Sequence, residues 1–195
     1  MGAMTNRGGL VGLMISICLI GSSSKALAAE TYKIDPTHSG VFFRIKHVNV
    51  SYFLGRFNAV SGKFVLDADR PANSLIEVTI KTDSIDTNSA DRDKHMKGPQ
   101  FFNVQKFPEM TFKSTKITKS GDHTYKVEGE FTLLGKTLPL TIQIEHVGEG
   151  RTFMGQRSGF FTTFTIKRSD FGMNAMLSGL GDEIHLTIGI EGVKK

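Results

Sequence analysis

The sequence is poor in residues that carry cross-links or reactive chemistry: it has one cysteine, no tryptophan, and six histidines without a His-x-His or His-x-x-x-His pair. Cys18 lies in an N-terminal segment that we expect to be removed, which excludes a disulfide scaffold, a thiol enzyme and a cysteine-ligated metal site. The histidine spacing gives no local support for a metal site. Lysine and arginine never occur in runs longer than two, so we expect no nucleic-acid partner.

Residues 1–28 have the layout of a secretory signal peptide. Arg7 precedes the uncharged run GGLVGLMISICLIG, and a short polar stretch leads to the small-residue sequence ALAAE. The run is shorter than the roughly 20 residues that a membrane-spanning helix needs, and a lipoprotein signal would have a small residue in place of Ile17. We therefore expect cleavage after Ala28 or Ala29 and a periplasmic protein, or an extracellular one if the organism has no outer membrane.

The remaining chain, residues 29–195, is long enough for one domain with a sizeable core. Of the 24 basic residues, Arg7 and Lys25 are removed with the signal, whereas all 19 acidic residues remain, so the mature chain is mildly basic. This charge balance indicates a solvated surface rather than a nucleic-acid site. No linker, low-complexity run or internal repeat divides the chain.

Apolar and polar residues alternate with period 2 through most of the mature chain, whereas helical periodicity is nearly absent. The alternation is typical of strands that are buried on one face and solvated on the other. Apolar positions recur in four long runs: Ile76, Val78, Ile80; Tyr125, Val127, Phe131, Leu133; Leu138, Leu140, Ile142, Ile144; and Ile184, Leu186, Ile188, Ile190. The segment HSGVFFRIKH, residues 38–47, alternates in the same way, except that His47 stands where another apolar residue is expected.

Short glycine-bearing segments between the runs predict an antiparallel meander. The predicted turns are SGDH (120–123), LGKT (134–137), VGEG (147–150) and SGLGD (178–182). Gly55, Gly62 and Gly159 are available for bends or bulges, which favours a curved or closed sheet.

One segment, residues 88–108, breaks the alternation. Ser89 can cap a short helix that runs through Met96, and Gly98 followed by Pro99 ends it. We expect this insertion to cover one open end or side of the sheet.

A barrel of about eight strands is either filled by its own side chains or holds one small or slender ligand. The inward-facing residues include Phe and Met but no pair of carboxylates, which suits an apolar guest better than a charged reaction. Met173 and Met176, in the glycine-rich segment FGMNAMLSGLG, either line the mouth of a cavity or form an ordinary buried cap. His47 and His146 each end an apolar register and form either a polar rim or hydrogen-bonded core histidines; we favour the core interpretation for His47.

Five stretches, in this order, resemble the YceI-like family of bacterial periplasmic, lipocalin-like proteins: DPTHSGVFFRIKH, GRFNAVSGKFVLD, IKTDSIDTNSADRDKHMKGPQFFNVQKFPEMTFKST, VEGEFTLLGKTLPL and RSDFGMN. The resemblance covers residues 31–193. It implies an all-β fold, namely an extended antiparallel eight-stranded lipocalin-like barrel with a short helix-bearing insertion and a long internal tunnel. It also implies that the ligand is a polyisoprenoid or similar long-chain amphiphile, such as a polyprenyl diphosphate or an isoprenoid quinone tail.

Under this resemblance we expect the lipid tail to contact inward-facing residues and the polar head to meet cationic or N–H donors at the mouth. The expected tail contacts are Phe43, Ile45, His47, Val78, Ile80, Phe131, Ile142, Ile144, His146, Phe164, Met173 and Met176. The headgroup candidates are Arg92, His95 and Arg168, together with Arg44 and Arg56. For each cation, a surface or structural ion pair is the alternative.

The combined expectation is a non-catalytic protein without a cofactor that transports or stores such a lipid between membrane-associated donors and acceptors. The oligomeric state stays open, and a dimer is possible. A metal-dependent periplasmic hydrolase with ligands gathered across strands, and a filled-core structural or stress-related domain, are the alternatives. We interpret DPTHS as a turn in which Asp35 and Ser39 bond backbone N–H groups, rather than as a nucleophile site with His38.

Overall fold

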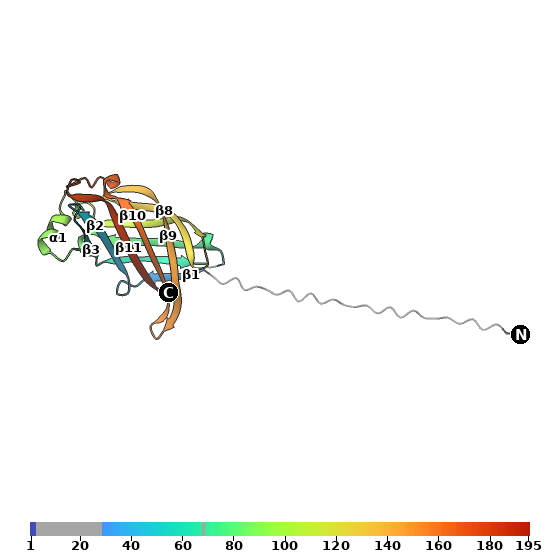
Figure 1. Ribbon diagram of the computed structural model, residues 1–195. Helices are drawn as coiled ribbons and strands as arrows, with labels where there is room; N and C mark the ends of the chain where they lie inside the picture. The colour runs from blue at the N-terminus through green and yellow to red at the C-terminus, as the bar shows by residue number, and fades with distance from the viewer. Residues whose placement is uncertain (3–28, 68) are drawn as a thin grey trace.

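Eleven strands form one antiparallel sheet in the computed structural model, which describes residues 1–2, 29–67 and 69–195 (Figure 1). In chain order the strands are β1 (Glu30–Ile34), β2 (Gly40–His47), β3 (Ser51–Phe57), β4 (Val60–Leu66), β5 (Leu75–Lys81), β6 (Ile85–Asp86), β7 (Glu109–Lys119), β8 (Thr124–Leu133), β9 (Lys136–Thr152), β10 (Gly155–Lys167) and β11 (Leu180–Lys194). Three short 3-10 helices lie at Pro71–Asn73, Thr82–Ser84 and Arg168–Phe171.

The sheet closes into a ring of eight strands: β1, β4, β5, β7, β8, β9, β10 and β11. Closure occurs because β1 pairs with β4 on one side and with the C-terminal end of β11 on the other. The expected eight-stranded antiparallel barrel is confirmed.

The β2–β3 hairpin lengthens the barrel at the end where β11 begins. β2 pairs with residues 180–189 of β11, β3 pairs with β2, and β6 adds to the outer edge of β3. One long strand, β11, therefore borders both the β1 end of the barrel and the β2–β3 end. This second end is where the insertion also lies (Figure 1).

Side-chain burial follows the alternation of the sequence. In β8, Tyr125, Val127 and Phe131 are buried, whereas Lys126 and Glu130 between them are exposed. Each fully buried side chain of this size contributes about 1.5–3 kcal/mol relative to exposure. The inward faces therefore supply most of the driving force for folding and also form the wall of the barrel interior.

Two of the four predicted turns are confirmed and two are not. SGDH separates β7 from β8, and Leu134–Gly135 of LGKT separates β8 from β9, with positive φ at both residues. The predicted turn at VGEG, residues 147–150, is wrong: β9 continues to Thr152, and Gly148 pairs with Gly159 of β10. SGLGD is wrong at its second half, because β11 begins at Leu180 and the loop instead occupies residues 172–179.

Of the three glycines predicted to allow bends or bulges, one lies at a bulge and one at a close approach of two strands. The β9–β10 register shifts between Gly159 and Phe160. Gly62 in β4 has φ +142°, and a Cβ there would lie 2.0 Å from the carbonyl oxygen of Glu77. Only glycine fits that close approach of two strands. The third, Gly55, contacts an aromatic ring instead.

The insertion contains the predicted helix, α1 (Ala90–Lys97), at one end of the barrel (Figure 1). The Ser89 hydroxyl caps it by accepting a hydrogen bond from the backbone N–H of Arg92 at 3.4 Å, and Gly98 follows its last residue. Thr87 fixes the helix to the chain before it, since its N–H and hydroxyl both donate to Asp93 Oδ1, at 2.8 and 2.5 Å.

The predicted signal peptide falls almost wholly outside the described residues. Among the residues that are described, no helix has the length and apolar character needed to cross a bilayer.

Candidate functional site

An outer cavity of about 320 Å³ lies inside the barrel at the end covered by α1 and the 172–179 loop. Its wall combines the inward faces of β2, β3, β8 and β11 with residues of the insertion. Of the residues predicted to contact ligand, it contains Phe43, Ile45, His47, Phe131, Met173 and Met176, and of the headgroup candidates Arg92, His95 and Arg168.

An inner cavity of about 80 Å³ lies further along the barrel. The predicted contact residues on its wall are Val78, Ile80, Phe131, Ile142, Ile144 and Phe164. Among the described residues that line it, none is charged, and Thr111 and Thr162 are the polar ones. This chamber can therefore hold only an apolar group without leaving a buried charge unpaired.

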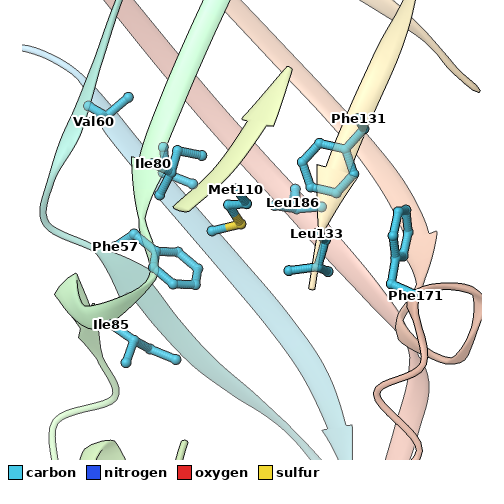
Figure 2. Close-up of a cluster of buried hydrophobic side chains, with 10 residues drawn as sticks. Phe57, Val60, Ile80, Ile85, Met110, Phe131, Leu133, Phe171 and Leu186 are labelled. Carbon is cyan, nitrogen blue, oxygen red and sulfur yellow. The ribbon is translucent and has the colours of Figure 1, made fainter. Parts of the chain in front are cut away.

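Three side chains, Met110, Phe131 and Leu186, border both cavities and form the partition between them. They come from β7, β8 and β11, and Figure 2 shows all three within the cluster of buried apolar side chains. Because Met110 is unbranched and has three rotatable bonds, it can change shape at low cost. The two cavities are thus neighbouring chambers that share three apolar side chains.

Arg92 is the cation best placed for a ligand headgroup. Its guanidinium lies 4.2 Å from the ring centroid of Phe53, and it donates to the Thr87 hydroxyl at 3.0 Å and the Thr87 carbonyl at 2.6 Å. A guanidinium has five N–H donors, so these bonds position Arg92 and leave further donors at the mouth. Among the described residues, no ion pair joins Arg92 to the neighbouring Asp91 or Asp93, so the alternative of a structural ion pair is not met for Arg92.

Arg168 lines the outer cavity, but its guanidinium forms hydrogen bonds to backbone carbonyls. It is 2% exposed and donates to the carbonyls of Gly181 at 2.9 Å, Met173 at 3.0 Å, Ala175 at 2.7 Å and Leu180 at 3.0 Å. Burial lowers the pKa of this guanidinium, and the nearby Asp182 carboxylate opposes that shift. The geometry makes Arg168 a support for the 172–179 loop, not a group that extends toward a ligand.

The three candidate histidines divide between the mouth and the barrel wall. His47 and His95 are exposed on the rim of the outer cavity, so the interpretation of His47 as a buried core histidine is wrong. His146 lines neither cavity: its Nε2 lies 2.9 Å from the Ser158 hydroxyl, and its ring packs 5.0 Å from that of Phe160. Burial lowers the pKa of His146, partly offset by Glu149. It is a hydrogen-bonded wall residue.

Arg44 and Arg56 lie on the outside of the cavity. The guanidinium of Arg44 stacks on Tyr52, 4.6 Å from its ring centroid, and Arg56 forms an ion pair with Asp86 at 3.0 Å. Neither residue lines a cavity in the described part of the chain. Both match the alternative of surface interactions.

Sequence reasoning missed several apolar residues of the insertion and of β3, most of them aromatic. Phe53, Met96, Phe101 and Phe102 line the outer cavity, and Phe102 packs edge-on against Phe57 with 5.4 Å between ring centroids. The adjacent pair Phe101–Phe102, in an otherwise polar segment, was the available signal. Two consecutive aromatic residues in such a segment indicate that it packs on an apolar surface.

The DPTHS turn is an ion-pair cluster between β1 and β2. Thr37 donates from its N–H and hydroxyl to Asp35 Oδ1 at 3.0 and 2.6 Å, and His38 Nδ1 lies 2.8 Å from Asp35 Oδ2. Hydrogen bonds from Thr37, Arg157 and His38 hold the pKa of Asp35 far below its usual range. Ser39 exchanges hydrogen bonds with the backbone of Glu191, so the prediction of a structural turn is met.

The same cluster holds the one group of three possible metal ligands in the part of the chain that the structure describes: Asp35, His38 and Glu191, with ligand atoms within 4.8 Å of one another. Arg157 donates to the carboxylates of both Asp35 and Glu191. A guanidinium already occupies the position where a divalent cation would need to bind both carboxylates. The arrangement fits an ion-pair network better than a metal centre.

A closed eight-stranded antiparallel barrel with an apolar cavity that opens at one end defines a lipocalin-like class of protein. The chain belongs to the YceI-like family, whose domain profile matches residues 32–192. It is 41% identical over 188 residues to a UPF0312 protein of Yersinia pestis (strain Pestoides F), covering 95% of this chain and 96% of that protein.

Solved structures agree with the fold. BcnA of Burkholderia cenocepacia aligns with a TM-score of 0.73 at 25% identity, over 81% of this chain and 98% of that one. The YCEI protein of Campylobacter jejuni aligns with a TM-score of 0.66 at 30% identity, over 77% and 89%. A polyisoprenoid-binding domain from Saccharophagus degradans aligns with a TM-score of 0.64 at 14% identity, over 84% and 98%, which bears on the fold alone.

Proposed function

We propose that this protein binds a long-chain amphiphilic lipid of the polyisoprenoid class, with the tail in the two cavities and the polar head at the mouth. The observation that carries the proposal is the pair of adjacent apolar chambers, of about 320 and 80 Å³. Ligand pockets in proteins span about 300–1,000 Å³, so the outer chamber alone reaches that range. A domain of the same fold from Saccharophagus degradans is named for polyisoprenoid binding, which makes this lipid class the first to test.

The apolar wall supplies the affinity. Each CH₂-sized group moved from water into the cavity contributes about 0.8 kcal/mol, so a five-carbon isoprene unit contributes roughly 4 kcal/mol before entropy costs. A tail that fills only the outer chamber leaves the partition in place. A longer tail must displace Met110, the most adaptable of the three partition side chains, to enter the inner chamber.

The mouth supplies the specificity for the head. Arg92 offers charge-assisted N–H donors beside His95, and His47 lies on the same rim. Such donors suit a phosphate, a diphosphate or a quinone carbonyl, because each of these groups accepts hydrogen bonds. We propose that the head stays at this rim, where water screens the groups that the protein does not contact.

The role that fits this arrangement is carriage or storage of the lipid in the periplasm after cleavage of residues 1–28. A slender tail exposed in water would aggregate or return to a membrane, whereas a closed barrel shields it. The wall offers apolar contact along the tail and hydrogen-bond donors at one end. Those are the requirements of a carrier, and no covalent step enters the proposal.

The test is native purification without detergent, followed by lipid extraction and mass spectrometry. The proposal requires a lipid with a long apolar chain at a stoichiometry near one per barrel. A barrel that emerges empty, and that takes up no polyprenyl lipid when one is supplied, contradicts it. Metal analysis of the same sample tests the alternative, because a site-filling amount of zinc or iron would favour the hydrolase.

A further inference from the structure

We propose that the end of the barrel around the cavity mouth docks onto an anionic phospholipid bilayer, so that the cavity opens toward the lipid phase. The docking surface consists of two adjacent loop tips: Val48 and Val50 between β2 and β3, and Met176 and Leu177 in the 172–179 loop. The use of this surface for lipid exchange rests on the proposed function, whereas the docking itself does not.

All four side chains are apolar and lie in solvent. Their exposed fractions are 50% for Val48, 84% for Val50, 55% for Met176 and 44% for Leu177. Single exposed apolar residues are common, but a group of them on neighbouring loops marks an interaction surface.

The two loop tips are joined to each other and to the cavity. The N–H of Val48 donates to the carbonyl oxygen of Gly179 at 2.7 Å, and His47 pairs with Leu180 where β2 meets β11. His47, Met176 and Leu180 also line the outer cavity. The exposed apolar side chains therefore border the opening through which a lipid would enter.

The backbone at these tips makes the choice of residues informative. Val48 and Asn49 have φ of 41° and 58°, and the N–H of Val50 donates to the His47 carbonyl at 3.0 Å. A turn with positive φ at both central residues strongly favours Asn or Gly, and a β-branched residue in that region is an outlier. Met176 likewise has φ of 57°. Val48 and Met176 are thus both exposed and held at a φ that their residue types disfavour, and such strained residues cluster at functional surfaces.

The charge around the mouth selects the occupant. Residues 40–66 contain no aspartate or glutamate, and residues 171–181 contain no charged side chain. Lys46 lies beside the docking surface, and α1 adds Lys94 and Lys97 along with the mouth residue Arg92; within the described residues, no ion pair involves these three lysines. α1 also carries Asp91 and Asp93, and Asp93 is bonded to Thr87. Apolar tips with nearby basic residues are the pattern that binds an anionic membrane surface.

The experiment measures flotation with vesicles of phosphatidylglycerol and phosphatidylcholine, and with vesicles of phosphatidylcholine alone. It uses the protein recovered after export, with its N-terminus determined by mass spectrometry and identical in all variants. The test variant combines Val48→Asn, Val50→Ser and Leu177→Ser. Asn tolerates positive φ, so this variant should keep its thermal midpoint.

The control variant removes exposed apolar side chains elsewhere. Phe153→Ser with Met154→Ser changes the β9–β10 hairpin tip, where the exposed fractions are 98% and 51%. Arg157, close to this tip on β10, pairs with Val193 near the C-terminal end of β11. Leu180, which lines the cavity at the mouth, is at the other end of β11. The control thus loses comparable apolar surface far from the mouth.

We expect the wild type and the control to bind anionic vesicles, with binding that weakens as salt is raised, and the test variant to bind at least about tenfold less. Equal binding by the test variant and the wild type, or no binding by the wild type, would overturn the docking proposal. So would a wild type that avoids vesicles but forms a dimer or a protein complex that the test variant cannot form. The same samples are extracted for lipid: unchanged lipid content with lost vesicle binding supports docking, while vesicle binding by a barrel that never holds lipid would contradict the proposed function alone.

Discussion

Replacing Ile142 by tryptophan should shorten the lipid that the barrel can hold. Ile142 lies on β9, is 8% exposed and lines the inner cavity. It pairs with Val127 on the neighbouring strand β8. The tryptophan side chain has about six more non-hydrogen atoms than the isoleucine side chain, and overpacking of this kind costs roughly 1–3 kcal/mol. The inner cavity of about 80 Å³ can take up part of the ring, so we expect the lower end of that range and an intact fold.

The loss of lipid affinity should be larger than the loss of stability. Excluding one isoprene unit of five carbons from the inner chamber forfeits about 4 kcal/mol of apolar burial, which corresponds to an upper limit near a thousandfold in affinity. The protein should therefore retain lipids shorter by about one unit, or lose most of its lipid if only long chains are supplied. The outer chamber, lined by other residues, should still hold its part of the tail.

The assay is mass spectrometry of lipid extracted from natively purified protein, with thermal unfolding measured on the same sample. Thr141→Trp is the matched control, because Thr141 precedes Ile142 on β9, is exposed and points outward. The same chain lengths and occupancy in Ile142→Trp and in the control would refute the inner chamber as part of the tail site.

Three further outcomes follow from the contacts. Arg92→Gln should weaken binding of lipids with an anionic head by at least about tenfold in a competition assay, since a hydrogen bond to a charged group contributes about 1.5–3 kcal/mol. Binding of a headless polyprenyl hydrocarbon should not change, and Lys94→Gln, two residues further along α1, should change neither. Arg168→Met should lower the free energy of unfolding, measured with denaturant, by about 3–5 kcal/mol, because it leaves four buried backbone carbonyls without their donor. Equal stability of Arg168→Met and the exposed-site control Lys167→Met would contradict this. Burial lowers the pKa of His146 in the folded protein below its ordinary 6.5, so the stability that this residue contributes is complete above pH 6.5 and is lost as pH falls toward the lowered pKa. In thermal melts, His146→Gln should therefore reduce the fall of the melting temperature with falling pH. The same pH dependence in the variant and the wild type would count against this role of His146.

The sequence was sufficient to predict most strands and the helix because the features that define them are local, whereas closure into eight strands followed only from the family resemblance, since the closing pair β1–β11 joins the two ends of the domain. Period-2 alternation places Tyr125, Val127 and Phe131 on one face without knowledge of their partners. The cap at Ser89 and the stop at Gly98 likewise act within one turn of chain. The error at VGEG has a physical reason: Gly148 and Gly150 pair across to β10 at its bulge, and glycine serves both a turn and a bulge.

The site was harder to predict, because its residues are distinguished by what they contact and not by local pattern. His47 and His146 occupy equivalent places in their sequence registers, yet one lies on the exposed rim and the other bonds Ser158 in the wall. Arg92 and Arg168 are both cations beside loops, but only the path of the chain from 173 to 181 surrounds Arg168 with carbonyls. Such differences depend on long-range packing, which the spacing of residue types does not encode.

Local sequence pattern also does not show whether a barrel of this kind is open or filled. A glycine opposite an aromatic residue is one feature that keeps it open. Gly55 on β3 stands directly across from Phe43 on β2, and a Cβ on Gly55 would lie 2.4 Å from the Phe43 ring. The Phe43 ring therefore occupies the space above the Gly55 backbone, and it also lines the outer cavity. A larger residue at position 55 would force the ring to move, and the open direction is the cavity. A strand that pairs a large aromatic residue with glycine thus keeps its apolar burial while leaving the centre of the barrel empty. Alternation alone cannot reveal this, because both a filled and an open barrel alternate; the cross-strand pairing of Phe43 with Gly55 distinguishes them.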